Sequence, residues 1–146
     1  MLLESALAYL SMGICVIATD ENKRALFPWK RYQGEMMTAE EITRQLTHPK
    51  AASIAAICGK ISGNMEVIDV DCKNDTEGSL FNRLCDNIPS EILDKLHIVK
   101  TKSGGYHIYF RCEKIEGNQK LASRLPTLDE KSRTPGVSQI VLIETR

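Results

Sequence analysis

The chain has 146 residues, of which 42% are hydrophobic and 26% charged, and this is the composition of one globular domain with its own core. Nineteen Lys and Arg residues balance nineteen Asp and Glu residues, which excludes a protein that holds nucleic acid through overall charge but not one with a local basic groove. No apolar run reaches the roughly 20 residues of a bilayer-spanning helix, and the N-terminus lacks the basic start of a signal peptide, so we expect a cytoplasmic protein with no membrane partner.

The first 63 residues predict an N-terminal α/β unit that begins with a helix. Apolar residues at helical spacing predict this helix over residues 2–12, and Gly13 ends it. A second helix is expected to begin after Thr38 and to run to about residue 47. Thr38 and Glu41 match a capping box, in which each side chain accepts a hydrogen bond from the other's backbone.

Two apolar runs, at residues 14–18 and 53–58, predict buried strands in the same unit. Trp29 lies in the irregular segment after the first run. We expect it to anchor that segment in the core, and stacking on a base is the minority interpretation. The turn at residues 59–64 lacks the pattern of a phosphate-binding P-loop.

From residue 64 onward the pattern is strand, helix, strand, strand, helix, strand. We expect these elements, in that order, at residues 66–71, 77–88, 97–101, 106–112, 117–125 and 139–144. The order is that of the ferredoxin-like βαββαβ unit found in RNA-recognition motifs (RRM), so the predicted fold class is α+β. Right-handed crossovers then give the strand order 4-1-3-2, with both helices on one face of the sheet.

Asp69 and Asp71 stand two residues apart on the first of these strands, in the stretch VIDVD. Residues two apart share one face of a strand, so both carboxylates point the same way while Ile68 and Val70 point into the core. Two adjacent like charges destabilise a strand unless something compensates. A hard divalent cation such as Mg²⁺ or Mn²⁺ is one compensation, and plain solvation of a strand end is the other.

The predicted strand order places the first strand in the middle of the sheet, between the third strand and the fourth. Asp69, Asp71, His107 and Glu144 should therefore converge on one patch of the open face. Three carboxylates on a sheet face suit a two-metal phosphoryl-transfer site. His107 could bond a phosphate oxygen there and would share its face with Tyr109.

The stretch Ser103-Gly104-Gly105 predicts a tight hairpin turn, with the two glycines in a two-residue loop. Ser103 and the backbone amides of Gly104 and Gly105 form a candidate anion nest beside His107. Positive charge near this turn would come from three residues, Lys100, Lys102 and Arg111.

These residues carry a resemblance to a known family. VIDVD, SGGYHIYF and IVLIE resemble the three motifs of the primase-polymerase (prim-pol) domain of the archaeo-eukaryotic primase superfamily, which is found in phage, plasmid and prophage replication proteins. The N-terminal half is also similar, with the order helix, G-x-x-V-I, Pro-Trp, helix and a G-x-x-S-G turn. The likeness covers nearly the whole chain, and the first two motifs are its specific part.

The resemblance implies a prim-pol fold over residues 1–146, with an N-terminal α/β unit at 1–63 and an RRM-like catalytic unit at 64–146. It implies that Asp69, Asp71 and Glu144 bind Mg²⁺ or Mn²⁺. The phosphates of an incoming NTP or dNTP would be bound by Ser103, Gly104, Gly105, Lys102 and His107. The reaction implied is nucleotidyl transfer to a 3′-hydroxyl on a single-stranded DNA template, as primer synthesis or extension.

Three alternatives remain open from the sequence. One is a non-catalytic RRM-like nucleic-acid-binding domain, although Asp69 and Asp71 would repel a phosphate chain. Another is a rolling-circle nickase, which needs a second histidine near His107. The third is a catalytically inactive prim-pol domain that binds template. The family continues past its third motif, so we expect a fragment of a longer replication protein, with a helicase or another replication domain beyond residue 146.

The five cysteines are odd in number and include no Cys-x-x-Cys pair. We expect free, mostly buried thiols of a reducing compartment, not a disulfide framework or a zinc site. They are Cys15, Cys58, Cys72, Cys85 and Cys112.

Overall fold

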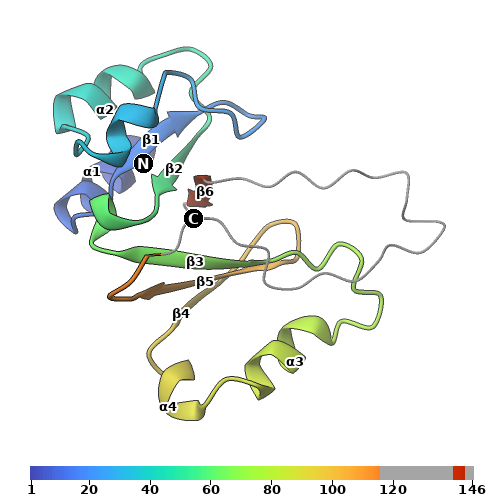
Figure 1. The fold of residues 1–146 in the computed structure, drawn as a ribbon. Helices are drawn as coiled ribbons and strands as arrows, with labels where there is room; N and C mark the ends of the chain where they lie inside the picture. Colours follow the sequence, from blue (N-terminus) through green and yellow to red (C-terminus); the bar gives the residue numbers. More distant parts are fainter. Residues whose placement is uncertain (116–139, 144–146) are drawn as a thin grey trace. The chain divides into compact units, whose positions relative to one another are not determined.

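The structure is a computed structural model that describes residues 1–115 and the strand at residues 140–143 (Figure 1). It has mixed helix and sheet, with two three-stranded sheets. The chain divides into two compact units, which we call unit 1 and unit 2. Unit 1 comprises Met1–Met65, Arg111–Ile115 and Ser138–Arg146, and unit 2 comprises Glu66–Phe110 and Glu116–Val137. The helix predicted at residues 117–125 lies outside the described residues.

Unit 1 contains one sheet with the strand order β1-β2-β6, in which both pairings are antiparallel. Its elements are α1 (Leu2–Ser11), β1 (Val16–Thr19), the 3₁₀ helix η1 (Lys30–Gln33), α2 (Ala39–Leu46), β2 (Ser53–Ile57), the 3₁₀ helix η2 (Lys60–Ser62) and β6 (Ile140–Ile143). The predicted helices and strands of residues 1–63 are therefore confirmed, with ends shifted by at most two residues.

The core of unit 1 forms around β1 and β2. Every residue of β1 is buried, as are four of the five residues of β2, so both strands have side chains covered on both faces. Ala6 of α1 and Ile42 of α2 complete the cluster. Trp29 is partly buried and packs against the same cluster, which confirms its predicted role as a core anchor.

Helix α2 begins with the predicted capping box. The Thr38 hydroxyl accepts a hydrogen bond from the Glu41 N–H at 3.1 Å, and the Glu41 carboxylate accepts one from the Thr38 N–H at 3.1 Å. The Thr38 N–H, foremost, and the charge of Arg31 hold the pKa of Glu41 below its ordinary value. The ionised carboxylate therefore stabilises the fold at neutral pH, and this contribution is lost as the pH falls through the lowered pKa.

We expect Thr38→Ala to lower the free energy of unfolding by about 1 kcal/mol, because it leaves the Glu41 N–H without its partner. Thr38→Ser keeps the hydroxyl and should stay within a few tenths of a kcal/mol of the wild type. Urea unfolding of the three proteins measures the difference. Equal midpoints for the alanine and serine variants would show that this cap does not stabilise the chain.

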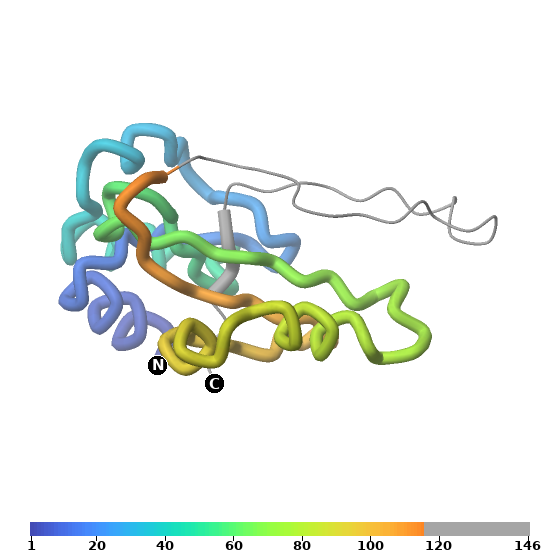
Figure 2. The backbone as a smooth tube through the Cα atoms, turned by 60° about the horizontal axis from the view of Figure 1, so that its bottom comes forward, coloured from blue at the N-terminus to red at the C-terminus, as the bar shows by residue number. Residues whose placement is uncertain are grey.

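Unit 2 contains the second sheet, with the strand order β3-β5-β4. Its elements are β3 (Met65–Val70, whose first residue belongs to unit 1), α3 (Leu80–Asp86), α4 (Ser90–Leu93), β4 (His97–Lys100) and β5 (Tyr106–Arg111). Helices α3 and α4 lie on one side of the strands (Figure 2), and the Phe81 ring of α3 stacks on Tyr106 with ring centroids 3.7 Å apart. This order confirms the 1-3-2 part of the predicted arrangement.

The last strand was predicted beside the first strand of this sheet, and that prediction is wrong. Strand β6 pairs with β2 in the other sheet, where Ile143 lies opposite Ile54 and Ile140 opposite Ile57. A continuous apolar run suits a sheet that is covered on both faces. Strand β2 offers such a position because it is buried, whereas β3 exposes Asp69.

Helix α3 is shorter and less buried than the pattern of residues 77–88 predicted. It begins at Leu80, whose N–H donates to the Asp75 carboxylate at 2.9 Å. None of its residues is fully buried, and Leu80 is 40% exposed. The predicted apolar face therefore packs only in part, through residues such as Phe81.

The five cysteines are free, as predicted, but only Cys15 is buried and the other four are half-buried. Burial raises the pKa of the Cys15 thiol. Within the described residues, no helix is long and apolar enough to cross a membrane.

Candidate functional site

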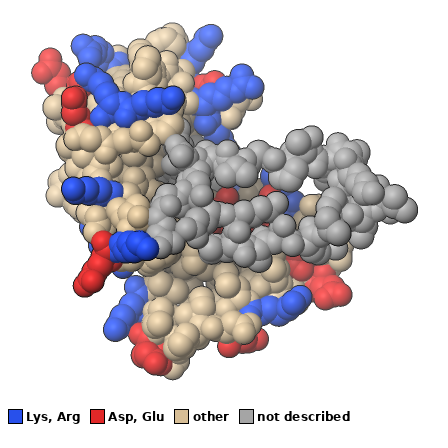
Figure 3. Space-filling view, viewed as in Figure 1, with Lys and Arg blue, Asp and Glu red and all other residues tan. Residues whose placement is uncertain are grey.

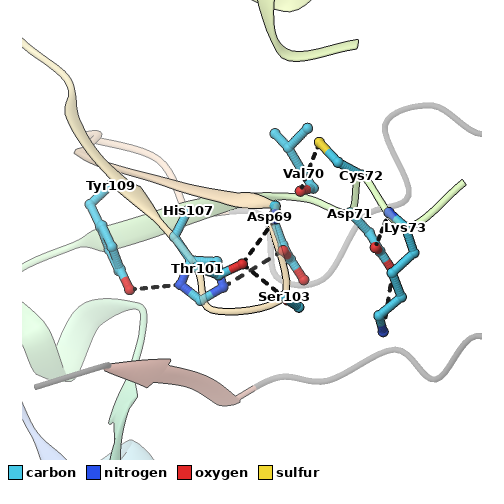
Figure 4. Close-up of polar contacts among 10 residues, drawn as sticks. Asp69, Val70, Asp71, Cys72, Lys73, Thr101, Ser103, His107 and Tyr109 are labelled. Carbon is cyan, nitrogen blue, oxygen red and sulfur yellow. Dashed lines mark hydrogen bonds and ion pairs between the residues drawn. The ribbon is translucent and has the colours of Figure 1, made fainter. Parts of the chain in front are cut away.

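The end of strand β3 presents the two carboxylates singled out in the sequence. Val70 is buried at 7% exposure, while Asp69 before it and Asp71 after it are exposed. Figure 4 shows both carboxyl groups below the strand in that view, with Asp69 turned toward His107 and Asp71 toward Lys73. The alternation of the strand therefore separates this polar pair from the core, as predicted.

Asp69 faces His107 across neighbouring strands β3 and β5. The His107 Nε2 lies 3.7 Å from the Asp69 Oδ1. The His107 side chain is only 13% exposed, whereas that of Asp69 is 68% exposed. Residues 38 positions apart in the chain (107 − 69) thus meet on one face of the sheet, opposite the face that carries Phe81 and Tyr106.

The other ring nitrogen of His107 is held by Tyr109, two residues along the same strand. The Nδ1 and the Tyr109 Oη are 3.1 Å apart, and the two rings meet edge to face. When the tyrosine hydroxyl donates to Nδ1, the proton of the neutral imidazole resides on Nε2, the nitrogen that faces Asp69. Tyr109 therefore orients the histidine, a role that sequence spacing alone did not reveal.

Asp71 has a different partner. The Lys73 N–H donates to the Asp71 Oδ1 at 3.0 Å, and the Lys73 Nζ lies 3.8 Å from the Oδ2. Burial, and then the negative charges of Asp75 and Asp71, raise the pKa of the Cys72 thiol between them.

The donor chemistry at β3 fits a hard divalent cation. Asp69 and Asp71 offer exposed carboxylate oxygens, which Mg²⁺ and Mn²⁺ prefer. In the described part of the chain, no group of three or more His, Cys, Asp or Glu side chains could hold a metal ion. Glu144, the predicted third ligand, lies outside the described residues. Its predicted convergence with Asp69 assumed that the last strand pairs with β3, whereas β6 pairs with β2.

The turn before β5 differs from the predicted two-residue loop. The Gly104 N–H donates to the Thr101 carbonyl at 3.0 Å, and the Thr101 N–H donates to the Gly105 carbonyl at 2.9 Å. This is a three-residue loop, Lys102-Ser103-Gly104, in which Gly104 has a φ of +86° and Gly105 does not have a positive φ. The loop is longer because Gly105 already pairs with Thr101.

Both glycine amides of the candidate anion nest are engaged inside this turn. Besides the Gly104 bond, the Gly105 N–H donates to the Thr101 Oγ1 at 3.1 Å. The same hydroxyl lies 3.0 Å from the Ser103 Oγ. An anion would reach these amides only after the turn rearranged, so the exposed Ser103 hydroxyl and Lys102 are the more accessible of the predicted phosphate-binding groups.

Gly105 is required for space and Gly104 for conformation. A Cβ on Gly105 would collide with the backbone oxygen of Val70, whereas one on Gly104 meets nothing within 4 Å. We expect Gly105→Ala to cost about 3 kcal/mol of unfolding free energy and Gly104→Ala about 1 kcal/mol. Thermal unfolding of both variants measures this order, and a larger loss for Gly104→Ala would contradict it.

Two of the predicted cationic neighbours of His107, Lys100 and Arg111, contact other groups instead. Lys100 pairs with Tyr106 in the sheet and lies over its ring at 6.0 Å, on the face opposite His107. The Arg111 guanidinium donates to the carbonyls of Ser62 at 3.2 Å and Gly63 at 2.8 Å. Arg111 therefore holds the turn after β2.

A comparison with protein-family profiles decides the family. The profile named Prim-Pol, for the N-terminal domain of bifunctional DNA primase/polymerases, matches residues 6–145. The chain belongs to the Prim-Pol family. No curated protein matches the chain.

The Prim-Pol match spans all three motifs noted in the sequence, from VIDVD through SGGYHIYF to IVLIE. The family implies nucleotidyl transfer in general. Of the sequence-predicted residues, the structure brings together Asp69 and His107, and it places Asp71 directly after β3 and Ser103 in the turn between β4 and β5.

Proposed function

We propose that this Prim-Pol chain is the catalytic domain of a DNA primase/polymerase that acts in plasmid, phage or prophage replication. It would transfer nucleotides from NTP or dNTP to a 3′-hydroxyl on a single-stranded template. The observation that carries the proposal is the approach of His107 to Asp69 across β3 and β5, beside the exposed Asp71. A histidine with one ring nitrogen held by a hydrogen bond, next to two carboxylates, is suited to binding a metal-bound triphosphate.

In the proposed site, Asp69 and Asp71 would hold Mg²⁺ or Mn²⁺. A cation held by these carboxylates would supply positive charge against the phosphates and a means of orienting the attacking hydroxyl. The family match and the two exposed carboxylates support this assignment.

His107 would donate its Nε2 proton to a phosphate oxygen of the incoming nucleotide. When the Tyr109 hydroxyl donates to Nδ1, Nε2 carries the proton and is the donor, and the low exposure of His107 limits competition from water. Ser103 would add a hydroxyl donor from the exposed turn, and Lys102 would add positive charge. These contacts hold the triphosphate in place for in-line attack, which is most of what a protein contributes to phosphoryl transfer.

Primer extension tests the proposal. The protein is incubated with Mn²⁺, a labelled primer on a longer template, and nucleotides, beside an Asp69→Ala/Asp71→Ala variant. We expect the wild type to lengthen the primer only with template and metal present, and the variant to fail. Equal extension by the two proteins would refute the metal-site assignment. No extension by the wild type under any combination of metal and nucleotide would refute the catalytic proposal.

A further inference from the structure

Unit 1 contains a pocket that the proposed catalytic function does not use. Its volume is about 350 Å³, within the range of small-ligand sites. It lies where the loop before η1, η1 itself and α2 meet. The residues that line it are Phe27, Pro28, Arg31, Tyr32, Arg44 and Gln45, and there is no carboxylate among them.

Gln45 lines this pocket and brings a side-chain amide to it. Its side chain is 94% buried (100 − 6), and its Oε1 accepts a hydrogen bond from the Ala18 N–H at 3.1 Å. That bond fixes which end of the amide is oxygen, so the NH₂ group is the other end. Within the described residues the NH₂ group has no hydrogen-bond partner. Among the described residues the buried side-chain atom without a partner is Glu66 Oε1, so the Gln45 NH₂ group is not a buried unsatisfied donor and remains open to solvent or to an acceptor on a ligand.

The two arginines add further donors. Arg31 is held in place by its ion pair with Glu41 and by its bond to the Tyr32 hydroxyl at 2.6 Å, and its guanidinium lies over the Tyr32 ring at 4.5 Å. Arg44 is exposed, and its guanidinium makes no hydrogen bond or ion pair with the described residues. The pocket therefore offers donors and positive charge, which select a ligand with acceptor oxygens and negative charge.

Phe27 gives the pocket an aromatic wall. It is 38% exposed, an unusual position for phenylalanine, and its ring meets His48 edge to face at 5.7 Å. Within the described residues no ring stacks flat on it. A half-exposed aromatic ring beside arginines is the combination on which proteins stack the unpaired bases of single-stranded nucleic acid.

The surface around the pocket is richer in positive charge than in negative. Figure 3 shows Lys and Arg side chains gathered over the upper part of unit 1. The exposed cations of residues 23–50 are Lys23, Arg24, Lys30, Arg31, Arg44 and Lys50. The exposed carboxylates of residues 20–50 are Glu21, Glu35 and Glu40. Such a local excess attracts a phosphate backbone although the whole chain has no net charge.

We propose that this pocket binds single-stranded DNA, with one base stacked on Phe27 and accepting from Gln45, and an adjoining phosphate on Arg44. The partner is a single strand because the base faces of a duplex are already stacked. The inference rests on the proposed function in one respect: the bound strand would be the template.

The test measures binding of a fluorescent oligothymidine by anisotropy, with no nucleotide and no divalent metal. We expect Phe27→Leu to weaken binding about ten-fold, because it keeps an apolar side chain but removes the ring. Phe27→Tyr should bind like the wild type. Gln45→Glu should weaken binding at least ten-fold. The variant keeps an oxygen that accepts from the Ala18 N–H, but it replaces the NH₂ donor with a negatively charged oxygen.

Arg44→Gln should lower the slope of the logarithm of affinity against the logarithm of salt concentration by about 0.7, the value for one phosphate contact on a single strand. Arg83→Gln on α3 is the matched control and should leave both affinity and slope unchanged. The assay contains neither a nucleotide nor a divalent metal, so its result does not depend on catalysis, and the pocket and the catalytic proposal can fail separately.

Unchanged affinity in Phe27→Leu, Gln45→Glu and Arg44→Gln would overturn the inference. A free mononucleotide that competes with the oligonucleotide at equal concentration of bases would overturn it as well, because the pocket would then be a nucleotide site. Preference for duplex over single strand would likewise contradict it. Circular dichroism of each variant establishes that a lost affinity does not reflect lost folding.

Discussion

Replacing either Asp69 or Asp71 with asparagine is expected to lower template-directed nucleotide incorporation at least about 100-fold. Asparagine keeps the size of the side chain but removes the charge that would hold a divalent cation. Stabilisation of phosphate charge by a metal is worth several kcal/mol, and each 1.4 kcal/mol of barrier is about ten-fold in rate. Initial rates of primer extension at saturating Mn²⁺ measure the loss.

Two variants serve as controls for this result. Lys73→Ala removes the partner of Asp71 but no carboxylate, and it should change the rate by less than about three-fold. Asp86→Asn removes an exposed carboxylate of α3 and should have no effect. Rates within three-fold of the wild type for both Asp69→Asn and Asp71→Asn would show that these residues are not the catalytic ligands.

The second large effect is expected at His107. His107→Ala should lower kcat/KM for the incoming nucleotide by about 10- to 100-fold, because it removes a hydrogen bond to a charged phosphate from a shielded position. Tyr109→Phe keeps the ring but loses the hydroxyl that holds Nδ1 at 3.1 Å. We expect it to lower kcat/KM about three- to ten-fold and to alter the pH profile of the rate, since the histidine loses the bond that fixes its tautomer.

His97→Gln is the matched control for these variants. His97 lies opposite Tyr109 on β4 and is exposed, but within the described residues it forms no ion pair with Asp69, and its replacement should change kcat/KM by less than about two-fold. A loss at His97 equal to that at His107 would indicate a general effect on the sheet. A wild-type pH profile for Tyr109→Phe would contradict the orienting role of the hydroxyl.

Local features of this fold could be predicted from the sequence because adjacent residues determine them. The capping box of α2 is a contact between Thr38 and Glu41, three positions apart, and it forms as predicted. The exposure of Asp69 beside a buried Val70 follows from the alternation of a strand. The meeting of Asp69 with His107 followed from a further step, the 1-3-2 order of a strand–helix–strand–strand unit.

The predictions that were wrong concern contacts between segments far apart in the sequence, where more than one pairing is compatible with the local pattern. Nothing in the apolar run of residues 140–143 distinguishes pairing with β3 from pairing with β2, and burial of β2 decides it. Gly104 and Gly105 were predicted to form a two-residue loop. In the structure Gly105 lies against the backbone oxygen of Val70, where only a glycine fits, and it pairs with Thr101, so the loop comprises residues 102–104. The pocket at Phe27 is lined by residues of the loop before η1, of η1 and of α2, so no local sequence motif predicts it.

The central claim is that Asp69 and Asp71 form a metal site, and titration with Mn²⁺ tests it most directly. Free Mn²⁺ has a strong electron paramagnetic resonance signal that weakens on binding, so bound metal is counted without any catalytic assay. The chain is titrated beside Asp69→Asn/Asp71→Asn, with Asp86→Asn as the control for an exposed carboxylate. We predict Mn²⁺ binding by the wild type and by the control, and its loss in the double variant. Equal binding by the double variant and the wild type would contradict the claim.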